Sequence, residues 1–274
     1  MDAGTSSTAT AGDIRYSANG GNVDLGLLSA SDSVSVVASA DITDADANEL
    51  ANIDSQLARL EAGGSIGSGS GAEDDTNAAA VDISVDNVEA EADVDLYLQS
   101  DQAVIVGDVG EVVTETDYAR FASGVTTETD TDADLEGLLA RDGPSKLKSD
   151  GTVTVEETVV ADSVDPSVKD DADVLVLTTS GDVDLNAAVT ADRHASVIAA
   201  AGVSQDGVIT ADADGTTGVS GEAGDAYVEA RAGDIAQNAN TTAGTDVRYA
   251  ASGSVTMDAG TSSTATAGDI RYSA

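Results

Sequence analysis

A short motif recurs along the chain and constrains its fold more than any other feature: a glycine, a small polar residue, then alternating apolar positions. Glycine readily takes positive φ, and the alternation turns every second side chain to one face. Each motif therefore predicts a turn followed by a short strand. The motif occurs at Gly12–Tyr16, Gly21–Leu25, Gly181–Leu185, Gly233–Ile235 and Gly253–Met257.

Equivalent apolar positions lie about twenty residues apart. The pairs are Val183 and Val203, Val208 and Val228, Val228 and Val247, and Ile235 and Val255. A repeat of this length indicates a solenoid. We expect each coil to hold two or three short strands.

The composition agrees with stacked coils. Coils stack at about 4.8 Å, so the narrow interior takes Val, Ile, Leu and Ala but has little room for large aromatic residues. The chain has no Trp, 1 Phe and 2 Pro, and a proline would remove a ladder hydrogen bond in nearly every strand. An immunoglobulin-type sandwich would need a larger aromatic core. The predicted fold is all-β, a right-handed parallel β-helix, with the hand following from the crossover rule.

The first eighteen residues, 1–18, recur without change at 257–274. The favoured interpretation is a longer tandem array, cut as one repeat plus the start of the next copy. The alternative is that the identical ends are swapped or docked elements of a head-to-tail assembly. Identical copies have no obvious complementarity, which favours the array over docked ends. The expected partners are further copies of this chain, in tandem or end to end, and cell-surface glycans are a further candidate.

Two segments interrupt the rhythm. Leu50, Ile53, Leu57 and Leu60 have helical spacing and are followed by Gly63, which predicts a helix over 43–63. The second segment runs from Thr126 to Lys148. It has a weak helical patch at Leu135, Leu138 and Leu139 and the pair Gly143-Pro144, and we expect it to be a surface loop. The expected divisions are coils at 1–42, 78–125 and 151–274, a helix with a Gly/Ser-rich insertion at 43–77, and a surface-loop insertion at 126–150.

Charge and composition exclude several classes of function. The net charge of −40 repels nucleic-acid phosphates. No apolar run is long enough for a membrane helix, and the start lacks the pattern of a signal peptide, so we expect no membrane insertion. Without Cys there is no disulfide, thiolate zinc site or Cys nucleophile.

Catalytic signatures are also missing. His194 is the single histidine, and a solvated turn residue is a better interpretation of it than a base beside Asp192. No Gly-x-Ser-x-Gly elbow is present, and the many acids leave any carboxylate pair unrecognisable in the sequence. We expect no catalytic residue and no enzymatic activity.

Calcium is the one cofactor that the sequence suggests, because alternating carboxylates are typical of oxygen-rich calcium loops. Neither acidic run completes an EF-hand, and solvated acidic faces of a protein adapted to a salty medium are the alternative. The candidate ligands are Asp130, Asp132, Asp134, Glu136, Asp212 and Asp214.

Aspartates that follow a glycine are expected to align along one corner of the stack, at Asp182, Asp225, Asp234 and Asp269. Like charges about 5 Å apart repel by about 1 kcal/mol even in water. The sequence therefore predicts that salt, and more strongly calcium, stabilises the fold.

The segments Thr179–Leu185 and Ala232–Ile235 resemble coils of filamentous-haemagglutinin-type exoproteins and other giant repetitive bacterial surface proteins. The resemblance is one of repeat style and covers 179–274 and 1–42 best. It implies an extracellular or cell-surface right-handed β-helix that works as a filament, stalk or adhesin, without catalytic residues.

Three functions follow from these observations. The favoured one is a structural tandem-repeat unit of a long extracellular or cell-surface filament. The alternative is an adhesin module that binds a glycan or surface, for which Tyr16, Tyr249 and Tyr272 could form an exposed stripe; packing near a corner of the rod is favoured for them. A polysaccharide-acting β-helix enzyme ranks third.

Overall fold

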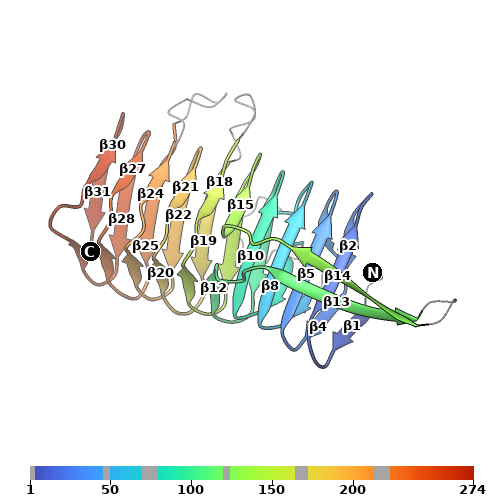
Figure 1. The fold of residues 1–274 in the computed structure, drawn as a ribbon. Helices are drawn as coiled ribbons and strands as arrows, with labels where there is room; N and C mark the ends of the chain where they lie inside the picture. The colour runs from blue at the N-terminus through green and yellow to red at the C-terminus, as the bar shows by residue number, and fades with distance from the viewer. Residues whose placement is uncertain (1–3, 46–49, 70–78, 120–123, 164–171, 213–222) are drawn as a thin grey trace.

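The computed structural model describes residues 4–45, 50–69, 79–119, 124–163, 172–212 and 223–274. These residues form an all-β chain in which most strands pair in parallel with strands of the coils before and after. Figure 1 shows the coils stacked into a rod with the two termini at opposite ends. This arrangement is consistent with the predicted parallel β-solenoid, and the right-handed winding stays a prediction.

Two long sheets run along the rod. In stacking order, sheet A contains β1 (Ser6–Ala9), β4 (Leu27–Ala30), β7 (Ile53–Asp54), β9 (Val81–Ser84), β11 (Leu96–Ser100), β16 (Ser145–Ser149), β19 (Val174–Thr178), β22 (Ala195–Ala199), β25 (Ala226–Ala230), β28 (Val247–Ala251) and β31 (Ile270–Ser273). Two further strands, β3 (Val23–Leu25) and β6 (Ile42–Asp44), pair beside the first coils.

Sheet B begins as one column of strands and then divides into two. The single column is β2 (Ile14–Ala18), β5 (Ser33–Ala38), β8 (Leu57–Ala62) and β10 (Asn87–Ala92). One branch is β12 (Val104–Val106), β17 (Val153–Val155), β20 (Val183–Leu185), β23 (Val203–Gln205), β26 (Ile235–Gln237) and β29 (Val255–Met257). The other branch is β15 (Leu138–Ala140), β18 (Val159–Ala161), β21 (Val189–Ala191), β24 (Ile209–Ala211), β27 (Thr241–Ala243) and β30 (Ser263–Ala265).

The division occurs at β10 and changes which sheet holds the long strands. The start of β10 pairs with β12 and its end pairs with β15. Before this point the six-residue strands belong to sheet B, and after it the five-residue strands belong to sheet A. A hairpin of β13 (Val112–Ala119) and β14 (Val125–Asp132) leaves the rod between β12 and β15, at the branch.

The predicted twenty-residue coil is present where no excursion intervenes. Val183 pairs with Val203, and Ile235 pairs with Val255, as the sequence predicts. The two spacings through Val228 do not mark pairs, because Val228 lies in sheet A and pairs with Val197 and Tyr249. Excursions between strands lengthen other coils without changing the stack.

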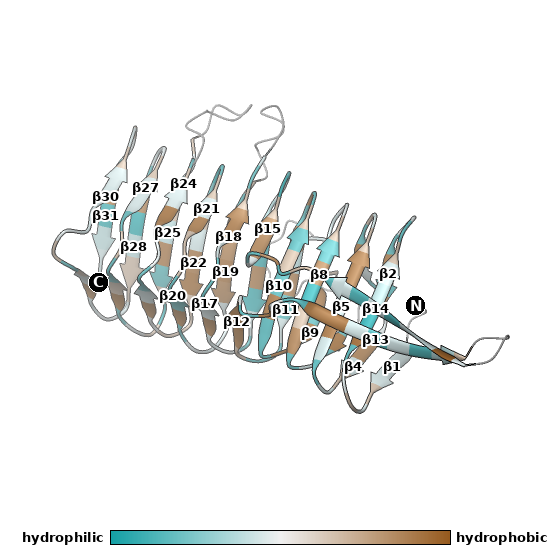
Figure 2. Cartoon of the chain, viewed as in Figure 1, coloured by the Kyte–Doolittle hydropathy of each residue, from teal (hydrophilic) through white to brown (hydrophobic). Residues whose placement is uncertain are grey.

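Inward side chains of successive coils form one continuous core from Ile14 to Tyr249, and in the last coil Ile270 is 46% exposed. They are mostly Val, Ile, Leu and Ala, and in the shorter strands they alternate with outward positions. Figure 2 shows apolar segments following one another from strand to strand along the rod. The pleat sends successive side chains to opposite faces, which explains why the period-two pattern was informative.

The predicted helix over 43–63 is wrong, and the described part of this segment forms β7 and β8 instead. Ile53 and Leu60 are buried, but they point inward from two different strands that meet at a corner. Their helical spacing is a consequence of that corner. β8 pairs with β5 and β10 along its whole length, and these ladders outweigh local helix propensity.

The segment 126–150, expected to be a surface loop, has two parts. Its first residues belong to β14 of the hairpin, whereas β15 and β16 are strands of the stack. Leu135 and Leu138, taken as part of a helical patch, are buried. The segment that leaves the stack therefore lies between β12 and β15 and contains the hairpin of β13 and β14.

Candidate functional site

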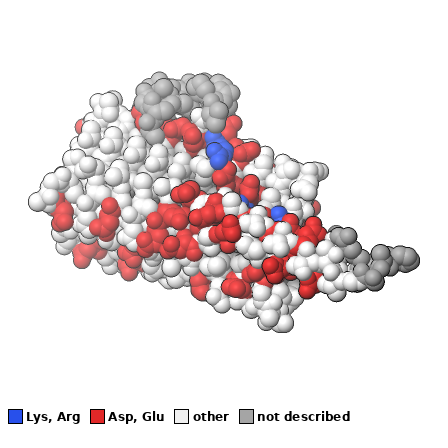
Figure 3. Space-filling model, viewed as in Figure 1, with Lys and Arg blue, Asp and Glu red and all other residues white. Residues whose placement is uncertain are grey.

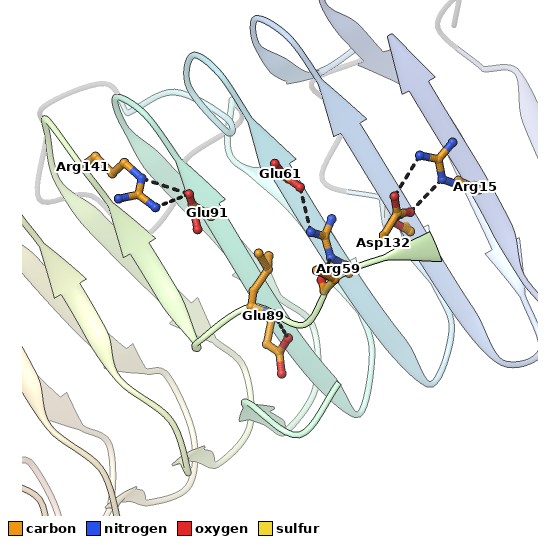
Figure 4. Close-up of polar contacts among 10 residues, drawn as sticks. Arg15, Arg59, Glu61, Glu89, Glu91, Asp132 and Arg141 are labelled. Atoms are coloured by element: carbon orange, nitrogen blue, oxygen red, sulfur yellow. Dashed lines mark hydrogen bonds and ion pairs between the residues drawn. The ribbon is translucent and has the colours of Figure 1, made fainter. Parts of the chain in front are cut away.

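The hairpin returns over the outer surface of sheet B, above a row of polar residues. Arg15 pairs with Ser35, Ser35 with Arg59, and Arg59 with Glu89, so these residues of β2, β5, β8 and β10 occupy one outward position in successive coils. We call this row the polar ladder. Arg15, Arg59 and Glu89 lie close to the hairpin and its base, as the close-up in Figure 4 shows.

Asp132, the last residue of β14, binds the N-terminal end of the ladder. Arg15 donates from Nε to Asp132 Oδ2 and from Nη2 to Asp132 Oδ1, each at 2.8 Å, and Ser35 Oγ donates to Oδ2 at 2.6 Å. Asp130 lies 3.7 Å from Arg15. Burial alone would raise the pKa of Asp132, but the hydrogen bonds from Arg15 and Ser35 outweigh it and lower the pKa.

Arg59 holds the next part of the hairpin base. Its side chain is almost fully buried, and its Nε donates to the carbonyl oxygen of Ala133 at 2.5 Å. Its Nη2 donates to Glu61 at 2.7 Å. Glu61 of β8 pairs with Glu91 of the neighbouring strand β10, and Glu91 forms an ion pair with Arg141. Each of these two neighbouring carboxylates therefore has its own arginine, which offsets their mutual repulsion.

Glu89 joins the two ends of the excursion. Its side chain is completely buried; Oε1 accepts the N–H of Val109 at 2.8 Å and Oε2 accepts the N–H of Leu135 at 3.1 Å. The pKa of Glu89 is raised to about 7: burial raises it most, the two backbone donors oppose this rise, and the nearby carboxylates of Glu157 and Asp134 add to it. Glu89 is thus a buried acid that titrates near neutral pH and fixes both legs of the hairpin.

The sequence did not single out Arg15, Arg59 or Glu89. The available signal was charged residues at the outward positions of strands one coil apart. Recognising it needs the correct coil boundaries, and the predicted helix over β8 concealed them.

The calcium candidates are distributed over two regions. Asp130 and Asp132 face Arg15, and Asp134 and Glu136 are exposed beside the hairpin base. Asp212 follows β24 with positive φ, and Asp214 lies outside the described residues. No group of three His, Cys, Asp or Glu within the described ranges is arranged to hold a metal ion. Calcium binding stays a prediction.

The four aspartates expected on one corner occupy two corners. Asp182 and Asp234 precede strands of sheet B, whereas Asp225 and Asp269 precede strands of sheet A. At both corners, Oδ1 of an aspartate accepts the backbone N–H at the same place in the next coil. These bonds join Asp182 to Gly202, Asp234 to Ser254, Asp225 to Asp246 and Asp246 to Asp269.

His194 takes part in the same corner bonding. Its Nδ1 accepts the N–H of Asp225 at 3.0 Å, and its own N–H donates to Asp173 Oδ1 at 3.1 Å. This is the structural role of a turn residue that the sequence favoured. Oδ2 of Asp225 also lies 3.5 Å from Nδ1, so this ring nitrogen contacts both the backbone and the carboxylate of the residue before β25.

The three tyrosines expected in corresponding positions point into the rod. Tyr249 is fully buried and stacks on Tyr272, with ring centroids 5.0 Å apart. Tyr16 packs against the core. Tyr272, in the last coil, is 39% exposed, whereas Tyr249 and Tyr16 pack inside the rod, which agrees with the packing alternative for these two residues.

Acidic side chains outnumber basic ones on the surface that carries the hairpin. Figure 3 shows Asp and Glu gathered over the middle and lower part of this face, with few Lys or Arg. No segment with the length and apolar character of a membrane-crossing helix is found in the described ranges.

Comparison with known proteins gave no match to a family model, to a curated protein or to a solved structure.

Proposed function

We propose that this chain is a structural tandem-repeat unit of a long extracellular or cell-surface filament. The observation that carries the proposal is the sequence and position of residues 257–274. They have the same sequence as 1–18, and they form the next coil of the rod. The extracellular setting rests on the resemblance of the repeat style to giant bacterial surface proteins.

The two identical segments make the same local structure at opposite ends of the rod. The Oγ of Ser7 lies 2.6 Å from the hydroxyl oxygen of Tyr16, and the equivalent Ser263 lies 2.7 Å from Tyr272. One hydroxyl donates to the other in both copies. The segment therefore keeps its shape whether a coil precedes it or follows it.

Together, the two segments define both sides of a junction between copies. On one side, β31 pairs with β28, and Asp246 Oδ1 accepts the N–H of Asp269 at 2.7 Å. On the other side, β2 pairs with β5, and Asp13 Oδ1 accepts the N–H of Ser33 at 3.1 Å. Asp13 and Asp269 are the same residue of successive copies. A junction coil in an array can thus pair with both neighbours without rearrangement.

An array also removes the exposed ends. The outer strands β1 and β31 each leave one edge unpaired within the described part of the chain, and such edges favour association. In a tandem array each edge is covered by the adjoining copy, as in other solenoids whose repeats contact only their neighbours.

Electron microscopy of a chain with two complete copies tests this proposal. Sheet A makes ten steps between adjacent strands from β1 to β31, and β31 is the β2 of the next copy. Each copy should therefore lengthen the rod by slightly less than ten steps of about 4.8 Å, or about 50 Å. A second copy that forms a separate particle joined by a linker, or an axial advance far from that value, would contradict the proposal. The single chain is the matched control for length.

A further inference from the structure

We propose that the hairpin of each copy clasps the preceding copy of the array across their junction. The acidic inner surface of the hairpin would dock on Arg248 and Tyr227 of sheet A in the preceding copy. This inference rests on the proposed tandem array and names an interaction surface within it.

The hairpin extends beyond the coil on which it is anchored. Figure 1 shows β13 and β14 running along the rod and past β1 and β2 at the N-terminal end. Beyond Asp130, most described residues of both strands are exposed, including Tyr118 at 40% and Val125 at 70%. A two-stranded ribbon without a packed face is marginally stable, so this part of the hairpin needs a partner surface.

The inner surface of the ribbon follows from its pairing. Asp132 and Asp130 face the sheet because both approach Arg15. Side chains alternate between faces along a strand, and directly paired residues of antiparallel strands share a face. The inner surface beyond Asp130 therefore consists of Thr116 with Glu128, and Tyr118 with Thr126.

Strand pairing also fixes what lies beneath this surface in an array. Arg271 is the Arg15 of the next copy, and it pairs with Arg248 of β28. Arg248 in turn pairs with Tyr227 of β25. The polar ladder under one hairpin thus continues without a break into the outward row of sheet A in the preceding copy.

The spacing brings opposite charges together. One coil advances about 4.8 Å and two hairpin residues about 7 Å. Arg15 lies between Asp132 and Asp130, so Arg248, one coil further, comes between Asp130 and Glu128.

The outward residues Arg248 and Tyr227 of sheet A complement the acidic inner surface of the hairpin. Arg248 is exposed, and its guanidinium lies 5.2 Å from the ring centre of Tyr227, which gives a cationic and aromatic surface on a strongly acidic protein. On this spacing Glu128 supplies a carboxylate over the coil of Tyr227 and about one coil from Arg248, and Tyr118, one residue pair further, comes over the region of Ser196, which pairs with Tyr227. Sheet A therefore offers the hairpin a cation and an aromatic ring.

Site-directed cross-linking in a two-copy chain tests the clasp. The natural sequence has no Cys, so introduced thiols are the only reactive ones. One tandem carries R248C in the first copy and E128C in the second, and the matched control carries E128C in the first copy and R248C in the second. A short bis-maleimide should close a loop in the first tandem, seen as a shifted band on a denaturing gel. The control should give none, because its two sites lie at opposite ends of the rod.

A charge exchange provides a second readout that does not depend on thiols. Arg248→Glu in the first copy should lower the midpoint of thermal unfolding of the tandem, and Glu128→Lys in the second copy should restore part of the loss. With the two substitutions placed in the opposite copies, no restoration is expected.

Microscopy of the same tandems separates the two proposals. A continuous rod with no order-dependent cross-link and no charge rescue would overturn the clasp and leave the array intact. Two separate particles would overturn the array and the clasp with it. Cross-linking in the predicted order alone, on a continuous rod, would support both.

Discussion

Replacing Glu89 with glutamine should remove a pH dependence that this residue imposes on the attachment of the hairpin. Glu89 is fully buried and accepts the N–H groups of Val109 and Leu135, and its pKa is raised to about 7. E89Q keeps the size of the side chain and one acceptor oxygen but cannot ionise. The variant therefore isolates the cost of charging this buried carboxyl.

The sign and size follow from the pKa. The folded protein holds the Glu89 proton up to about pH 7, whereas the exposed carboxyl loses it near 4.5. Between these values the folded state binds more protons, so the stability contributed by Glu89 falls as pH rises. The difference of about 2.5 units, at 1.36 kcal/mol per unit, amounts to about 3 kcal/mol. The stability of E89Q relative to the natural protein should therefore rise by about 3 kcal/mol from pH 4 to pH 8.

Urea unfolding at constant ionic strength measures this difference, with hydrogen exchange at the amides of Val109 and Leu135 as a local readout. Glu115 of β13 is exposed, so E115Q removes the same charge and serves as the control for general repulsion. The control should move by much less over the same range. If E89Q and the natural protein keep a constant difference in stability from pH 4 to pH 8, the assignment of a buried titrating acid at the hairpin base is refuted.

Three further outcomes are expected. Gly207→Ala places a Cβ 1.8 Å from the carbonyl oxygen of Ala187 in the preceding coil and should lower stability by about 2–4 kcal/mol in urea unfolding; Gly21→Ala meets open space and is the matched control. Asp182→Asn keeps an oxygen that accepts the N–H of Gly202 and removes a charge, so its thermal midpoint at low salt should be at least that of the natural protein. Asp182→Ala loses the acceptor and should lower the free energy of unfolding by about 1 kcal/mol. An equal loss of stability in both variants would contradict the hydrogen-bonding role of Asp182. Thermal midpoints should rise from low salt to high sodium chloride, and more with millimolar calcium; equal midpoints in all three would remove the calcium prediction.

The kind of fold could be predicted from the sequence, because coil stacking imposes strict local requirements. An inward position must be apolar and small, as at Val183 and Val203, and each corner must accommodate a tight turn. These requirements recur every coil, so the period is visible without any long-range information. The repeated ends were visible in the same way, since identity needs no structure to be recognised.

The sequence could not place the charges that the chain carries. With acids so frequent, Glu89 looked like any other, and its burial depends on a hairpin that returns from the coil after it. Arg15 and Asp132 are 117 positions apart and meet only because the hairpin folds back over β2. Such pairs arise from tertiary contacts, which leave no periodic signal.

Where the local pattern allowed both helix and strand, pairing with neighbouring coils selected the strand. Ile53 and Leu60 satisfy helical spacing, yet β5 and β10 offer β8 unbroken ladders on both sides. The same competition decides the division of sheet B at β10, where one long strand pairs with two short ones. Backbone hydrogen bonds in a solenoid are made between coils, so the partner coil, and not the local sequence, determines where each strand begins and ends.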